Sequence, residues 1–158
     1  MPTSITLEQI NTFNVAYAFS IDDDQLESWP FFFVEDCFYK VTTVENQLQG
    51  LPAGLIYADS RWMLQDRVTA LRDANIFERH RYRHIVGTAL IAARNGQGID
   101  CETPFQITRI MRGGKPELFT TGKYVDHFVV QEKDVLKLAK RIVVCDSVSF
   151  DTLLALPL

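Results

Sequence analysis

Two of the three histidines lie four residues apart in a stretch that also holds three arginines, E-R-H-R-Y-R-H-I-V-G (78–87). On a helix, this spacing would place both rings on one side, as in zinc proteases of the H-E-x-x-H type. The glutamate of that motif is absent, because an arginine follows the first histidine. On a strand, alternate residues face opposite ways. One face would then carry His80, Tyr82 and His84, and the other would carry Arg79, Arg81 and Arg83.

Three uses of this stretch are open. A metal site would need a further ligand such as His127, and the neighbouring arginines would repel the cation. A general base would need only one histidine and a carboxylate, for which the candidates are Asp36, Asp126 and Asp146. The third use is structural: hydrogen-bonded core or interface histidines, with arginines that face solvent or carboxylates of another subunit. We favour the third, and predict no catalytic, cofactor-binding or metal-ligating residue in this chain.

Other catalytic motifs are missing from the sequence. It has no G-x-S-x-G elbow, no P-loop and no G-x-G-x-x-G that opens a helix. Asp22–Asp24 lack the spacing of a calcium loop. Cys37, Cys101 and Cys145 are too far apart for a C-x-x-C motif or a disulfide framework, and none lies in an iron–sulfur motif. We therefore predict three buried thiols in a cytoplasmic protein.

Composition predicts one globular domain, residues 1–158. The chain is 47% hydrophobic and 23% charged, with a formal net charge of −4. This charge argues against nucleic-acid binding, which uses basic surfaces. No apolar run approaches the roughly 20 residues of a membrane span, and no secretory signal is visible.

The first third of the chain is predicted to be mostly helical. Thr6 and Gln9 have the form of a capping box. Apolar residues then recur at helical spacing, at Leu7, Ile10, Phe13 and Tyr17. Asp22–Asp24 offer the N-cap of a second, short helix that Trp29-Pro30 would end.

A strand is expected over 34–44 and a loop over 48–54. Asp59 or Ser60 can then cap a third helix, whose apolar positions are Leu64, Val68 and Leu71.

From about residue 79 the apolar period changes to two. We predict four strands in an antiparallel meander, at roughly 79–93, 99–112, 117–130 and 135–145. On the second of these, Ile99, Cys101, Phe105, Ile107 and Met111 share a face. Pro104 suggests an edge or a bulge, because proline cannot donate to a ladder. Helices followed by strands indicate an α+β fold, with helices over one face of a sheet.

The last twelve residues, S-V-S-F-D-T-L-L-A-L-P-L, are unusually apolar for a tail. We expect residues such as Leu156 and Leu158 to pack against the chain's own sheet or against a neighbouring subunit.

The sequence resembles a known family in four segments that follow in order: W-P-F-F-F-V-E-D-C-F-Y-K-V (29–41), A-D-S-R-W-M-L-Q-D-R-V-T-A-L-R (58–72), the histidine–arginine stretch (78–87), and the closing K-R-I-V-V-C-D-S…D-T-L-L-A-L-P-L. The order of elements is similar to the cone-shaped fold of nuclear transport factor 2, ketosteroid isomerase and scytalone dehydratase. Within that group the chain resembles the small (β) subunits of Rieske non-haem iron aromatic-ring-hydroxylating dioxygenases. It looks most like the terephthalate dioxygenase type, with the salicylate 5-hydroxylase and anthranilate dioxygenase types behind it.

This resemblance implies a structural subunit of an aromatic-ring-hydroxylating oxygenase that acts on a single-ring aromatic carboxylate. The implied partner is a large (α) subunit, in an α3β3 hexamer, with a reductase that supplies electrons from NAD(P)H. The Rieske [2Fe-2S] cluster and the mononuclear Fe(II) would belong to the large subunit. The subunit-interface candidates are then Arg79, His80, Arg81, Tyr82, Arg83, His84, Leu156 and Leu158.

Two alternatives stay open beside this hypothesis. One is a stand-alone isomerase or dehydratase of the same fold, which would use a His–Asp pair in the cone. The other is a small binding module of the transport-factor kind.

Overall fold

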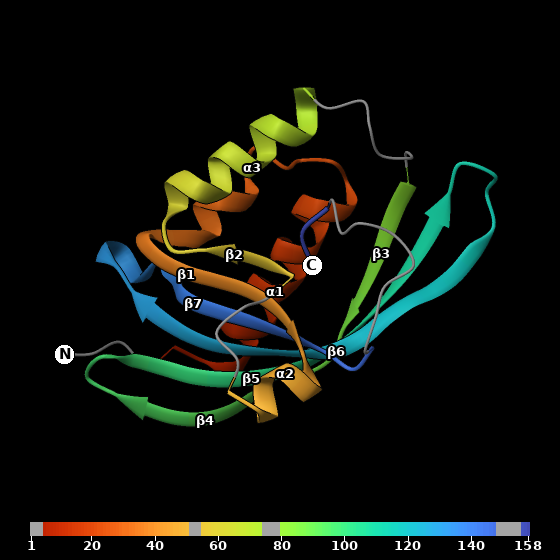
Figure 1. Cartoon of the computed structure of the whole chain (residues 1–158). Helices are drawn as coiled ribbons and strands as arrows, with labels where there is room; N and C mark the ends of the chain where they lie inside the picture. The colour runs from red at the N-terminus through yellow and green to blue at the C-terminus, as the bar shows by residue number, and fades with distance from the viewer. Residues whose placement is uncertain (1–4, 51–54, 74–79, 148–155) are drawn as a thin grey trace.

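In the computed structural model, the described residues are 5–50, 55–73, 80–147 and 156–158. They form one curved sheet of seven strands, with α1 and α3 on the same side of it (Figure 1). This is the predicted α+β arrangement. Among the described residues, no helix combines the length and the apolar character needed to cross a membrane.

The first helix, α1 (Leu7–Asp22), begins at the predicted capping box. The Thr6 hydroxyl accepts from the Gln9 main-chain N–H, and the Gln9 side chain accepts from Thr6 N–H. Three residues of the predicted stripe face the core, but Leu7 is 38% exposed. The buried face of α1 runs through Ile10, Asn14, Tyr17 and Ile21. Because Asn14 is polar, the periodicity of apolar residues does not identify this face.

The predicted second helix, ending at Trp29-Pro30, is wrong. Residues 23–28 form turns, and a single-turn 3-10 helix, η1 (Trp29–Phe32), begins where the helix was expected to end. Pro30 lies in its first turn, where a main-chain N–H has no helical acceptor to lose.

The next elements are β1 (Phe33–Thr43), the short helix α2 (Val44–Leu48) and β2 (Ile56–Ala58). β1 confirms the predicted strand. α2 was not predicted, although the Thr43 hydroxyl caps it by accepting from Asn46 N–H. Of the expected loop, residues 51–54 lie outside the described part.

Helix α3 (Arg61–Asp73) is the predicted third helix. Ser60 caps it, because its hydroxyl accepts from the Met63 main-chain N–H. Leu64 and Val68 are buried and Leu71 packs against the core, as the spacing predicted.

The single strand expected over 79–93 is divided into β3 (His80–Val86) and β4 (Leu90–Asn95). Both pair with the long strand β5 (Gly98–Met111), β3 with its second half and β4 with its first. The break lies beside Pro104, whose carbonyl accepts from Gly87 N–H at 2.9 Å. A side chain on Gly87 would come within 2.8 Å of the Pro104 ring. Pro104 therefore interrupts the ladder on one side of β5, while on the other side it pairs with Lys123.

β6 (Pro116–Val130) and β7 (Leu136–Cys145) complete the predicted meander, joined by the single turn η2 (Glu132–Asp134). The strand order is β2-β1-β7-β6-β5-β3, with β4 also on β5. β1 runs parallel to β7, so the sheet is mixed and not wholly antiparallel as expected. The reason is topological: the chain passes from β1 through α3 and the meander before it returns beside β1.

Candidate functional site

The histidine–arginine stretch forms β3 and presents its two faces as predicted. Tyr82 and His84 are buried and His80 is half-buried, whereas Arg81 and Ile85 are exposed. The Tyr82 ring lies 5.1 Å from His80 and 6.0 Å from His84, between ring centroids, and stacks on Phe119 of β6. Arg79 lies outside the described residues. The inward face of β3 is therefore an aromatic part of the core.

His84 has a carboxylate partner, and it is not one of the three predicted from the sequence. Its Nδ1 lies 2.7 Å from Oδ1 of Asp22, the last residue of α1. The other oxygen of Asp22 accepts from the His84 main-chain N–H, also at 2.7 Å. Because β3 is an edge strand, this N–H has no strand to pair with. Asp22 thus closes the sheet edge and orients the histidine, a role that its position at the end of an apolar helix did not reveal.

Asp126, one of the predicted partners, lies with Arg141 of β7 in the interior of the cone, between the curved sheet and α1. Arg141 Nε and Nη2 donate to the two carboxylate oxygens, each at 2.8 Å, and both side chains are fully buried. Nη2 also donates to the Asn14 side chain at 2.6 Å. The guanidinium lies between the rings of Tyr17 and Tyr124, 4.3 and 4.0 Å from their centroids. Both oxygens of Asp126 are therefore occupied, which leaves this carboxylate poorly suited to act as a general base.

The other predicted partners are also engaged or exposed. Asp146 accepts a hydrogen bond from the Thr121 hydroxyl, and Asp36 is exposed. His127 of β6, the suggested third metal ligand, pairs with Asp100 of β5 at 2.6 Å. Among the described residues, no three histidine, cysteine or acidic side chains lie close enough together to hold a metal ion.

Leu158, a candidate for a subunit interface, lies in the chain's own core and is fully buried. Its main-chain oxygen accepts from the hydroxyls of Tyr17 and Tyr39, at 2.8 and 3.0 Å. Leu156 is partly buried and packs against the same core. Of the two expectations for the tail, these residues fit packing on the chain itself. Tyr82, His84 and Leu158 are thus buried within the isolated chain.

An apolar groove runs along the outside of the molecule between α1 and β3. This groove has a volume of about 180 Å³ and is lined by Val15, Ala18, Phe19, Asp22, Arg83, His84, Ile85 and Val86. Three of its apolar side chains are strongly exposed: Val15 by 45%, Phe19 by 49% and Ile85 by 59%. Arg83 reaches across it, with its guanidinium 5.8 Å from the Phe19 ring and 3.8 Å from Asp22. We call this surface the α1–β3 groove.

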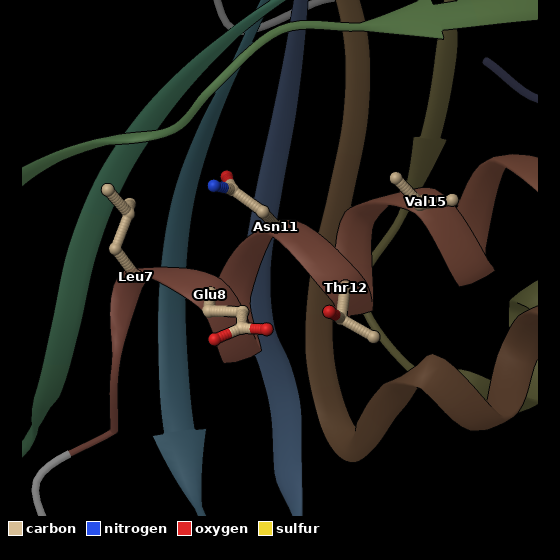
Figure 2. Close-up of a pocket in the computed structure, with 5 residues that line it drawn as sticks. All are labelled: Leu7, Glu8, Asn11, Thr12 and Val15. Atoms are coloured by element: carbon tan, nitrogen blue, oxygen red, sulfur yellow. The ribbon is translucent and has the colours of Figure 1, made fainter.

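A second hollow, of about 450 Å³, lies beside α1 alone. Figure 2 shows its five lining side chains, of which Asn11 and Thr12 point away from each other. Asn11 is already used, because its side-chain oxygen accepts from Ala89 N–H at 2.9 Å. Because these side chains do not converge, the hollow offers no arrangement of groups for binding or catalysis.

The three cysteines are free and buried, as predicted. Burial raises the pKa of Cys37 and Cys101 to about 11 and that of Cys145 to about 12. The thiolate is the reactive form, so none of them is a nucleophile at neutral pH.

Known proteins are similar to this chain in sequence and in fold. Residues 17–151 match the family model described as ring hydroxylating beta subunit. The chain belongs to that family. It is 51% identical to the terephthalate 1,2-dioxygenase terminal oxygenase component subunit beta 1 of a Comamonas species, over 95% of this chain and 97% of that protein. It is 40% identical to the anthranilate 1,2-dioxygenase small subunit of Burkholderia cepacia, over 90% and 88% of the two chains.

The crystal structure of a related beta subunit has the same fold as this chain. The beta subunit of a putative aromatic-ring-hydroxylating dioxygenase from Novosphingobium aromaticivorans superposes with a TM-score of 0.88 at 39% identity, over 96% of each chain. The family resemblance and the cone-shaped fold expected from the sequence are thereby confirmed.

Proposed function

We propose that this chain is the non-catalytic small subunit of a cytoplasmic ring-hydroxylating dioxygenase that acts on a single-ring aromatic carboxylate. The observation that carries the proposal is 51% identity, over nearly all of both chains, to a beta subunit of a terephthalate 1,2-dioxygenase terminal oxygenase component. The anthranilate enzyme's small subunit supports the same substrate class, because anthranilate is also a single-ring carboxylate. The Rieske cluster and the mononuclear iron would reside in a large subunit, with three copies of each chain in the complex.

The interior of the cone supports a structural role. Its buried carboxylate is paired with Arg141, and its tyrosine hydroxyls at 17 and 39 are bound to Leu158. A general base must be able to reach a substrate proton, and these groups are engaged within the chain.

We further propose the α1–β3 groove as the docking face for the large subunit. A monomer gains nothing from leaving Val15, Phe19 and Ile85 exposed side by side, whereas apolar anchors of this kind form the centres of subunit interfaces. Arg83 at the rim, and exposed Arg81 farther along β3, would meet carboxylates of the partner. His80, half-buried at the start of β3, would border the same contact; of the other expected interface residues, Arg79 lies outside the described part.

Co-expression with a candidate large subunit tests the proposal. The two chains should co-elute, and light scattering should give a mass equal to three copies of each. Iron should be found in the complex and be absent from the small subunit purified alone. Stoichiometric iron in the isolated chain, or its turnover of an aromatic acid, would refute the assignment.

The His84–Asp22 pair supports a second candidate, a stand-alone isomerase or dehydratase. Its two side chains line the α1–β3 groove, and Nε2 of His84 has no hydrogen-bond partner among the described residues. In such an enzyme, Asp22→Asn would lower turnover by about 10²-fold or more. A matched change at the other pair, Asp100→Asn beside His127, would leave turnover unchanged. In the assembly subunit, neither variant alters a chemical step in the purified complex.

A further inference from the structure

A third hollow, of about 330 Å³, lies on the surface where η1 meets α1 and the start of β7. We call it the Phe31 hollow. Phe31 is 48% exposed, whereas the other aromatic side chains of the W-P-F-F-F run (29–33) are buried or half-buried. The residues that line the hollow are Phe13, Ser28, Phe31, Phe32, Leu136 and Lys137. The hollow is therefore a mainly aromatic surface that is open to solvent.

The aromatic walls of the Phe31 hollow are fixed by packing. The ring centroid of Phe13 lies 5.3 Å from that of Phe32 and 5.1 Å from that of Phe128, which belongs to the core. Both contacts are edge-to-face, an arrangement that aromatic rings prefer. A flat aromatic ligand can add one more ring to such a cluster, so these walls favour it over an aliphatic ligand of the same size.

Two polar groups line the same hollow and have hydrogen bonds still to give. Ser28 precedes η1 and is exposed, and its hydroxyl does not cap the helical turn. Lys137 Nζ donates to the main-chain oxygen of Phe31. An ammonium group has three N–H donors, so two remain for a ligand. Apolar walls with a few polar groups are the usual composition of a small-molecule site.

The charge near Phe31 determines which polar group such a ligand should carry. Lys137 is one of two cations here, and the other is Arg61, whose guanidinium lies 5.2 Å from the centroid of the Phe31 ring. In the described part of the chain, both cations donate to main-chain oxygens, and neither forms an ion pair with a carboxylate. Partial burial and the charge of Arg61 lower the pKa of Lys137. A bound carboxylate would supply the negative charge that both cations lack.

We propose that the Phe31 hollow is a binding site for compact aromatic carboxylates, with the ring on Phe31 and Phe32 and the carboxylate at Lys137 and Ser28. The acidic side chain of another protein would offer the same charge, but the aromatic walls favour a carboxylate that is joined to a ring. A small acid has few atoms and the hollow is open, so we expect a dissociation constant on the order of 1 mM for benzoate. The inference does not depend on the large subunit.

Titration of the full-length chain with benzoate at neutral pH, followed by two-dimensional NMR, tests the proposal. The amide signals of the lining residues should shift in a saturable way, and NOEs should join the benzoate ring protons to the Leu136 methyl groups. Benzamide keeps the ring and loses the charge, and it should bind about fivefold more weakly or worse. Acetate keeps the charge and loses the ring, and it should also bind about fivefold more weakly or worse.

Two lysines of β7 provide the matched variants. Lys137→Met keeps the length of the side chain and removes its charge, so it should weaken benzoate binding about fivefold or more. Lys140→Met, at an exposed lysine of the same strand, should leave binding unchanged. Equal binding by the two variants would overturn the proposal, and so would benzamide or acetate that binds as tightly as benzoate.

The native chain decides the question if Lys137→Met does not fold, since that variant also loses the hydrogen bond to Phe31. Saturable shifts with NOEs to Leu136 would support the site. Benzoate that gives no saturable shift, or NOEs only to residues outside the hollow, would refute it. Neither result bears on co-elution with a large subunit, so a failure here is distinct from a failure of the proposed function.

Discussion

The interior of the cone and the α1–β3 groove use the same helix, α1, in opposite ways. Inside, α1 contributes Asn14 and Tyr17 to a polar network around Arg141 that is sealed from solvent. Outside, the same helix exposes Val15 and Phe19. A stable monomer normally buries apolar groups and exposes polar ones. The main charged pair of the interior is satisfied within the chain, whereas the apolar side chains of the groove are left for another molecule to cover.

Removing one member of the buried ion pair should have the largest effect. Asp126→Ala leaves the Arg141 charge buried without its carboxylate, which should cost about 3–5 kcal/mol of unfolding free energy. Urea denaturation measures this loss. The double variant Asp126→Leu/Arg141→Met is the control, because it removes both charges, and it should recover most of the stability. A small loss in Asp126→Ala would mean that the interior is not sealed.

The His84–Asp22 pair lies between the core and the α1–β3 groove, and the His127–Asp100 pair, which is more exposed, provides a matched comparison. Asp22→Ala should cost about 3 kcal/mol, because both the His84 ring and its main-chain N–H lose a charged acceptor in a buried place. Asp100→Ala removes the partner of His127, which is partly exposed, and should cost less than about 1 kcal/mol. Thermal or urea unfolding of both variants gives the comparison. Equal losses would contradict a structural role for Asp22 at the edge of β3.

The smallest effect is expected at an exposed ion pair away from both regions. Hydrogen bonds from Arg72 lower the pKa of Glu27 to about 2, from an ordinary value of 4.5. The lowered pKa means that the folded state holds the proton less tightly than the unfolded state. Glu27 therefore stabilises the fold above about pH 4.5, and this contribution is lost as the pH falls towards 2.

Unfolding experiments across this pH range, on the native chain and on Glu27→Gln, measure the contribution of Glu27. The pair is solvent-exposed, so the difference between the two proteins at neutral pH should stay below about 1 kcal/mol and shrink in acid. A difference that grows as the pH falls would contradict the assigned sign.

Local patterns in the sequence predicted most of the elements, because caps and periodicity act over a few residues. The capping box at Thr6, the cap at Ser60 and the two faces of β3 are of this kind. The turn around Trp29 was misjudged, since proline can begin a helical turn as well as end one.

The contacts that define the site join residues far apart in sequence, and local sequence patterns carry little signal for such contacts. Asp22 and His84 are 62 positions apart, and Tyr17 and Leu158 are 141 apart. Three aspartates were equally plausible partners for a histidine until the fold selected a fourth. The parallel pairing of β1 with β7 is likewise decided by the path of the whole chain.

The most direct test of the account is whether the α1–β3 groove holds the large subunit. Ile85→Asp places a charge in the groove, while Trp62→Asp does so at a side chain of α3 that is 70% exposed. Each variant is co-expressed with the large subunit, and co-elution is measured by size-exclusion chromatography. The account predicts at least a tenfold loss of complex for Ile85→Asp, with an unchanged Tm of the small subunit alone, and normal assembly for Trp62→Asp. Normal assembly of Ile85→Asp together with loss of complex in Trp62→Asp would place the docking face elsewhere and contradict it.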